Sequence, residues 1–142
     1  MITAVVARHG RLDAFFVNAG IEGRVMPLTE YPTDLFDRVF AVNVRGVFLG
    51  LKYALPVMQR QGGGGIAITS SVAGFRGSPG LSAYSSSKHA VVGLMRTAAK
   101  EVAASGVRVN TIHPSPIETR MMRSIEEGAV PGAGDRAKER FT

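Results

Sequence analysis

Apolar residues follow two alternating patterns along this chain. Short apolar runs rich in β-branched and aromatic residues occupy residues 12–17, 66–71 and 107–114. Between these runs, residues 34–61 and 83–104 carry apolar side chains spaced three and four positions apart. A short apolar run bounded by turn residues indicates a buried strand, whereas three-four spacing indicates an amphipathic helix. The pattern therefore predicts the order strand, helix, strand, helix, strand.

Turn-forming residues mark where several elements begin and end. Gly10 follows a first helical stretch, in the position where a left-handed glycine commonly ends a helix. Pro32 suits the first turn of the long helix, because its missing N–H would have no helical partner there. Gly106 is placed to end the second long helix, and Thr119 is placed to cap a further short helix after the last strand. Asn43 is a weak helix former, so we expect a kink there.

Long crossovers between apolar strands are typical of parallel βαβ units with right-handed connections. We therefore expect an open α/β sheet. In such sheets the ligand site lies beyond the carboxyl ends of the strands. The segments at those ends are residues 18–20, 70–74 and 113–119, which makes them the first places to look for chemistry.

Length and composition fit one globular domain over residues 1–142. The chain has 45% hydrophobic and 20% charged residues, with no internal repeat or linker. Its net charge of +6 is spread along the chain, and the tightest basic cluster, residues 135–140, also holds two acidic residues. We therefore expect no nucleic-acid face. The absence of cysteine excludes a disulfide framework and fits a cytoplasmic protein.

Membrane and metal sites are not expected either. The chain starts without the basic segment of a signal peptide. Asn43, Arg45 and Lys52 interrupt the longest apolar stretch, so we do not expect it to span a membrane. His9 and the other two histidines lack metal-ligand spacing with any partner, so we expect no metal site.

Tyr84 and Lys88 are the first candidates for catalysis. A spacing of four places both on one face of a helix. A nearby ammonium favours phenolate, so Lys88 is expected to lower the pKa of Tyr84 toward neutrality. Such a tyrosine can give a proton to a substrate oxygen or take one from an alcohol. Ser71, thirteen residues earlier at a strand end, could hydrogen-bond a substrate carbonyl. The pair alone is weak, because many helices carry it by chance.

Five stretches taken together are far more specific than this pair. They are "LDAFFVNAG", "FDRVFAVNVRGVFLG", "IAITSSVAG", "SAYSSSKHAVVGLMRTAAKE" and "VRVNTIHPSPIETRM". In this order they resemble the short-chain dehydrogenase/reductase (SDR) family, in its single-domain branch. The resemblance covers nearly the whole chain except its tail. It implies a three-layer, Rossmann-like α/β fold and an oxidoreductase that uses NAD or NADP.

The resemblance also implies a role for each catalytic candidate. Tyr84 would be the general acid/base, and Lys88 would lower its pKa and bind the nicotinamide ribose. Ser71 would hold and polarise the substrate carbonyl. Asn43 would keep a water in a proton relay behind Lys88. Hydride would pass directly between the nicotinamide and an alcohol or ketone substrate.

Besides Tyr84 and Lys88, the resemblance implies cofactor contacts from loops at the strand ends. These are Asn18, Ala19, Gly20, Pro114, Ile117 and Thr119. Residues 18–20 would line the adenosine-ribose side of the cofactor. Ile117 and Thr119 would contact the nicotinamide carboxamide.

The sequence resembles only the middle of such an enzyme, namely strands four, five and six with their crossover helices. The family's opening strand with its G-x-x-x-G-x-G loop does not occur in it, nor does the closing strand. Residues 62–65 are glycines, but they follow a helix and precede a strand, the reverse of a phosphate-binding loop. We therefore expect the 142-residue chain by itself to bind dinucleotide weakly and to turn over slowly or not at all.

Two other functions remain open at this point. The same scaffold could carry out epimerisation or dehydration, or the chain could be a non-catalytic interaction fragment. The helices expected at residues 34–61 and 83–104 resemble those that pair subunits in the family, so we expect a homo-oligomer.

Overall fold

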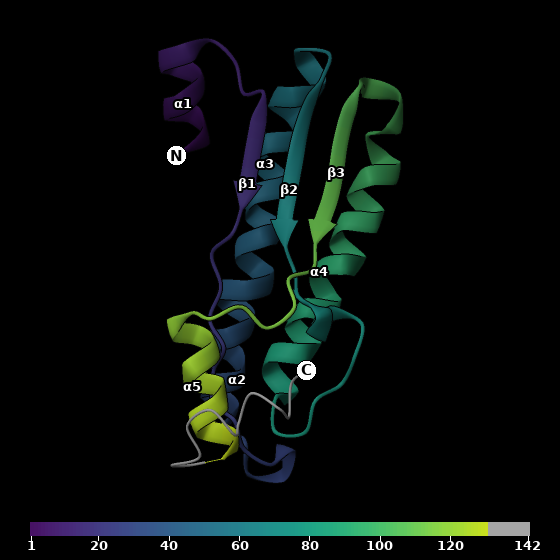
Figure 1. The fold of residues 1–142 in the computed structure, drawn as a ribbon. Helices are drawn as coiled ribbons and strands as arrows, with labels where there is room; N and C mark the ends of the chain where they lie inside the picture. Colours follow the sequence, from purple (N-terminus) through teal and green to yellow (C-terminus); the bar gives the residue numbers. More distant parts are fainter. Residues whose placement is uncertain (131–142) are drawn as a thin grey trace.

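The structure is a computed structural model that describes residues 1–130; the basic cluster at 135–140 lies outside the described residues. Its helices and strands are α1 (Ile2–His9), β1 (Ala14–Val17), α2 (Thr33–Phe40), α3 (Gly46–Arg60), β2 (Gly64–Thr69), α4 (Ser82–Glu101), β3 (Val107–Ile112) and α5 (Arg120–Ala129). A π-helical turn, Ala41–Arg45, joins α2 to α3. Figure 1 shows the strands side by side, with α3 and α4 behind them.

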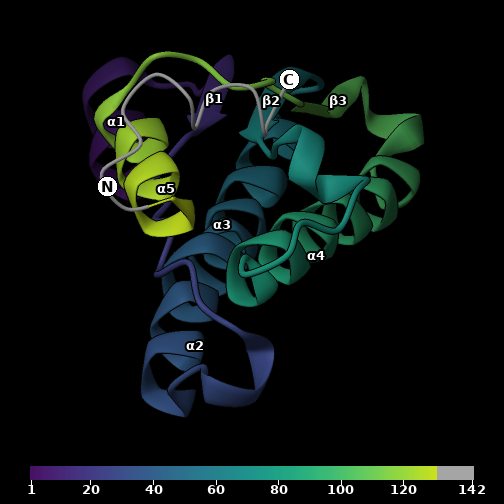
Figure 2. The ribbon, with the colours of Figure 1, turned by 60° about the horizontal axis from the view of Figure 1, so that its bottom comes forward.

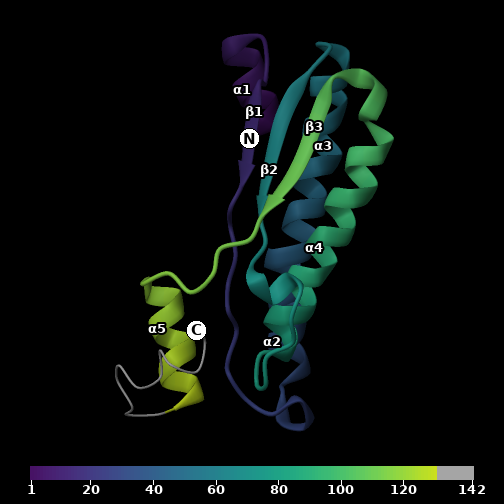
Figure 3. The same ribbon diagram turned by 45° about the vertical axis from the view of Figure 1, so that its right-hand side comes forward.

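The strands form a parallel sheet in the order β1-β2-β3, which confirms the predicted βαβ arrangement. Phe15 is paired with Ile66, and Ile66 with Val109, so these side chains form one row across the sheet. The row faces α3 and α4, whereas Phe16 points to the opposite face and is 56% exposed. Each right-handed crossover places its helix on the same face. Residues 1–130 therefore build two of the three expected layers (Figure 3).

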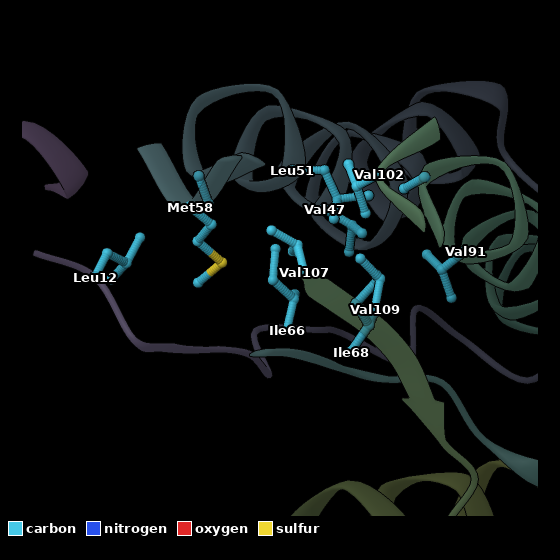
Figure 4. Close-up of a cluster of buried hydrophobic side chains, with 12 residues drawn as sticks. Leu12, Val47, Leu51, Met58, Ile66, Ile68, Val91, Val102, Val107 and Val109 are labelled. Atoms are coloured by element: carbon cyan, nitrogen blue, oxygen red, sulfur yellow. The ribbon is translucent and has the colours of Figure 1, made fainter. Parts of the chain in front are cut away.

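The hydrophobic core lies between this face and the long helices (Figure 4). Its buried members are Leu12, Val47, Leu51, Ala54, Met58, Ile66, Ile68, Val91, Ala98, Val102, Val107 and Val109. Side chains of α1, among them Val5, pack against the same cluster at its β1 end. Burying these side chains supplies the main favourable free energy of folding.

The helical stretch Thr33–Arg60 is, by length and composition alone, apolar enough to cross a membrane. One face of it, including Val47 and Met58, is buried in the core, and a core helix passes the same test. Only 28% of its most apolar window is buried, and Phe48 and Tyr53 lie exposed on α3. The helix therefore combines a core face with two partly exposed aromatic side chains, whose rings lie beneath the Lys52 ammonium.

The predicted boundaries lie within three residues of those in the structure, and two of the differences have identifiable reasons. Gly10 and Gly106 adopt left-handed backbone angles, φ 75° and 70°, as expected for glycines that end helices. Pro32 precedes α2 in an extended conformation rather than lying in its first turn. Strand β2 begins at Gly64, inside the glycine run interpreted as a connector. A Cβ on Gly64 would lie 2.7 Å from Met58, so the core requires glycine where apolar periodicity is absent.

Candidate active site

The short turn after β2, Val72–Gly74, packs against α4, and the Lys88 side chain of α4 reaches the strand end before this turn. Lys88 Nζ donates a hydrogen bond to the backbone oxygen of Thr69, at 2.9 Å, where β2 ends. Thr69 Oγ1 donates to Asn18 Oδ1, at 2.8 Å, just beyond β1. These two bonds join α4 to both strand ends.

Asn43 lies in the π-helical turn, which packs against α4 (Figure 2), and is 2% exposed. Its Oδ1 accepts from the Ile21 N–H at 2.8 Å, and its Nδ2 donates to the Ile21 oxygen at 2.9 Å and to Ser87 Oγ at 3.0 Å. Ser87 Oγ in turn donates to the Tyr84 backbone oxygen at 2.7 Å. The side chain of Asn43 thus fixes the loop after β1 to the helix that carries Tyr84. The predicted water relay through Asn43 stays a prediction.

Lys88 is a buried cation. Lys88 is 5% exposed, and burial lowers the pKa of its ammonium to about 8. Nζ lies 5.5 Å from the centroid of the Tyr84 ring, over its face. A positive charge there interacts favourably with the ring. Lys88 and Tyr84 therefore share one face of α4, as their spacing predicts.

The expected direction of the Tyr84 pKa was wrong for this structure. Burial raises the pKa of the phenol above its ordinary value, because a phenolate is poorly solvated there. Hydrogen bonding with the Ser71 side chain lowers the pKa, and the nearby Glu22 carboxylate raises it, but burial dominates. Tyr84 is therefore held in its protonated, acid form at neutral pH.

Ser71 lies at the turn that follows β2. Its backbone is extended, and its Oγ accepts from the Ala73 N–H at 3.1 Å, which caps the short 3-10 turn Val72–Gly74. The neighbouring Ser70 donates from Oγ to the Lys88 backbone oxygen at 3.0 Å. A Cβ on Gly74 would lie 2.5 Å from Ser70 Oγ, so this glycine lets the turn approach α4 closely. Ser70 and Ser87 thus both brace the helix that carries Tyr84 and Lys88.

The residues near Lys88 fit the ribose and nicotinamide part of a dinucleotide. A Cβ on Gly20 would lie 3.5 Å from Lys88 Nζ and 3.4 Å from Asn43 Oδ1, so glycine keeps the space beside the ammonium open. The ammonium can donate three hydrogen bonds, and the Thr69 oxygen takes one of them. Asn18 and Ala19 line one end of a groove of about 670 Å³ along the β1 edge. The glycines at 62–65 lie at the amino end of β2, away from this site.

The remaining predicted cofactor residues lie on the loop after β3. The Pro114 oxygen accepts from the Val72 N–H at 3.1 Å, which holds the start of this loop beside Ser71. Ile117 is 56% exposed. Thr119 caps α5, accepting from the Met122 N–H at 3.2 Å, as predicted. Among residues 1–130, no group of His, Asp and Glu side chains could hold a metal ion.

Replacing Lys88 by methionine is expected to stabilise the folded chain at neutral pH. Burial lowers the pKa of Lys88 from 10.5 to about 8, so between these values the unfolded state binds more protons. The cost of the buried charge is therefore fully present below about pH 8 and fades as the pH rises toward 10.5. It is on the order of 3 kcal/mol, and losing the bond to Thr69 offsets about 1 kcal/mol of the gain.

Urea unfolding of wild type and Lys88→Met at about pH 7 and about pH 10 measures this effect. We expect a gain of about 2 kcal/mol at the lower pH and nearly none at the higher one. Lys52→Met, at an exposed position on α3, is the matched control. An equal gain at both pH values would show that the buried charge is not the cause.

Comparisons with known proteins show the family and the fold of this chain. A profile of the short chain dehydrogenase family matches residues 1–129. Levodione reductase from Leifsonia aquatica is 43% identical over 140 residues, which cover 99% of this chain and 52% of that protein. A crystal structure of levodione reductase is 43% identical and matches with a TM-score of 0.94, over 99% of this chain and 54% of that one.

Two further similar structures are of relatives with a bound cofactor. NAD+-bound xylitol dehydrogenase is 42% identical with a TM-score of 0.78, over 80% of this chain and 44% of that one. ElxO with NADP bound is 36% identical with a TM-score of 0.87, over 97% and 55%. The chain spans about half the length of the curated relatives it matches. Its sequence and fold together place it in the short-chain dehydrogenase/reductase family.

Proposed function

We propose that this chain carries the proton-transfer centre of an oxidoreductase that moves a hydride between NAD or NADP and an alcohol or carbonyl substrate. The observation that carries the proposal is the convergence of Tyr84, Lys88 and Ser71 at the carboxyl edge of a parallel sheet. The NAD+-bound and NADP-bound relatives support the choice of cofactor.

Tyr84 acts as the general acid in carbonyl reduction. Its raised pKa keeps the proton on the phenol, ready for transfer to the substrate oxygen, and in alcohol oxidation the same oxygen takes the proton back. Ser71 Oγ donates a hydrogen bond to the substrate oxygen and orients it toward Tyr84. The Lys88 ammonium, beside the ring, stabilises the phenolate left by proton transfer. The bound nicotinamide supplies or accepts the hydride.

The loops that follow the strands would position the cofactor. Lys88 is placed to donate to ribose hydroxyls, and the Gly20 backbone leaves room beside it. The other residues that would hold the cofactor are Asn18, Ala19, Pro114, Ile117 and Thr119. Asn18 and Ala19 would line the adenosine-ribose side, and Ile117 and Thr119 would contact the nicotinamide carboxamide.

The partners we propose are a small alcohol or ketone and further copies of the chain. Homo-oligomers would form through residues 34–61 and 83–104. The exposed aromatic side chains of Phe48 and Tyr53 on α3 support this interface. The dispersed charge supports neither a nucleic-acid partner nor an anionic membrane surface. A cytoplasmic location is supported by the absence of cysteine.

A chimera tests the proposed function directly. Residues 1–129 would replace the matching segment of levodione reductase, which supplies the parts of the family fold outside this match. We expect the chimera to oxidise NADH or NADPH in the presence of levodione or a simple cyclic ketone. Deuterium at C4 of the nicotinamide should then appear on the carbinol carbon of the product. A folded chimera that binds cofactor but transfers no deuterium to any carbonyl would contradict the proposal.

A further inference from the structure

The proposed function leaves one residue beside Ser71 without a role. His113 lies after β3, and its Nδ1 is 2.9 Å from the backbone oxygen of Ser71. Its Nε2 is 2.8 Å from Oγ1 of Thr111. A carbonyl oxygen carries no proton, so Nδ1 is the donor in the bond to Ser71. Both ring nitrogens of His113 are thus engaged, one by the Ser71 oxygen and the other by the Thr111 hydroxyl.

Two more contacts hold the same turn against the end of β3. The Val72 N–H donates to the Pro114 oxygen at 3.1 Å. The Phe75 ring stacks on the His113 ring, with centroids 4.1 Å apart and planes 29° apart. The sheet ladder itself stops earlier, at the bond from the Ser70 N–H to the Ile112 oxygen. Beyond that bond, the Ser71 oxygen accepts from the Gly74 N–H at 2.9 Å within the turn and from His113 Nδ1 at the end of β3, so His113 is the contact that ties this oxygen to the neighbouring strand.

The direction of the Ser71 side chain depends on this backbone. Its Oγ already accepts from the Ala73 N–H, so the hydroxyl proton is the part that can turn toward a substrate oxygen. We propose that His113 is a positioning residue: by holding the Ser71 carbonyl, it aims the Ser71 hydroxyl at Tyr84 and at the substrate oxygen. The inference rests on the proposed function for its catalytic meaning, but its geometry does not require a cofactor.

The pKa of Tyr84 depends on the orientation of the Ser71 side chain, and it can be measured without any turnover. Hydrogen bonding with Ser71 lowers the pKa of the phenol against the larger effect of burial. The charged groups that face the phenol are Lys88, on α4, and Glu22, in the loop after β1. Loosening Ser71 while leaving these two groups in place should therefore raise the pKa of Tyr84. A general loss of stability would instead lower the folded fraction without moving the midpoint of the titration.

The test is an NMR titration of the chain labelled at the tyrosine Cζ carbon, with the Tyr84 signal assigned through Tyr84→Phe. Ser71→Ala sets the largest expected rise of the midpoint, roughly half to one pH unit for one lost hydrogen bond. His113→Phe keeps the ring stack on Phe75 but removes the donor, and should raise the midpoint by a smaller amount than Ser71→Ala, because the Gly74 N–H still donates to the Ser71 oxygen. His113→Asn places an amide donor near the Nδ1 position and should restore most of the wild-type value.

An unchanged Tyr84 midpoint in folded His113→Phe would overturn the inference, as would an equal rise in His113→Asn and His113→Phe. If His113→Phe does not fold, the ¹⁵N shifts of the His113 ring in the wild type decide: an Nε2–H tautomer excludes the bond to Ser71. An inactive chimera, combined with a raised midpoint in His113→Phe, would defeat the proposed function and support the positioning of Ser71.

Discussion

Tyr84→Phe in the levodione reductase chimera should lower kcat for carbonyl reduction by at least about 100-fold, the range typical of a lost general acid. The substitution removes one hydroxyl and keeps the ring that the Lys88 ammonium overlies. The backbone oxygen of Tyr84, which accepts from Ser87, is also unaffected. We therefore expect the fold and cofactor affinity to persist while proton transfer to the substrate oxygen fails.

Steady-state kinetics and NADH fluorescence measure these two effects separately. Tyr53→Phe removes the hydroxyl of an exposed tyrosine on α3 and should leave kcat unchanged. A Tyr84→Phe chimera that retains more than about a tenth of its kcat would mean that another group supplies the proton, because general acids contribute more than that.

Asn43→Ala should destabilise the folded chain by about 3 kcal/mol. The substitution removes three hydrogen bonds, two to the backbone of Ile21 and one to Ser87. Asn43 is 2% exposed, so water does not readily replace the lost partners. Part of the cost is the desolvation of the Ile21 N–H and C=O groups left unpaired.

Urea unfolding gives the change in stability, and hydrogen exchange at the Ile21 amide shows where it arises. We expect that amide to lose protection in Asn43→Ala even where the core amides keep theirs. Asn110→Ala, at an exposed position on β3, is the control and should change stability by less than about 0.5 kcal/mol. A loss below about 1 kcal/mol in Asn43→Ala would mean that water takes over these bonds.

Apolar periodicity predicts the order of the elements well, because a buried strand and an amphipathic helix need different spacings. It also predicts the ends marked by Gly10 and Gly106, where the backbone is left-handed. It fails at Gly64, since a strand can pair through its backbone where contact with Met58 forbids a side chain.

The candidate site, too, is only partly predictable from the sequence. Helical spacing brings Tyr84 and Lys88 together, but spacing gives proximity and not burial, so it predicts the wrong direction for the Tyr84 pKa. His113 and Ser71 are 42 positions apart, and their bond exists only because β2 and β3 are neighbours. No local pattern encodes such a partner; a predicted sheet order with strand-end residues aligned would have suggested it.

The π-helical turn at Ala41–Arg45 has a consequence for how this sequence can change over generations. Such a turn amounts to one extra residue inside an otherwise regular helix. Deleting one residue between Asn43 and Val47 would restore regular α-helical winding and leave the relative facing of α2 and α3 nearly unchanged, because the wider turn spreads the extra residue over about the same rotation. Asn43 and Val47, both buried now, would then be three positions apart instead of four, which keeps them on one face of the helix. Single-residue deletions should therefore be better tolerated in this turn than within α3.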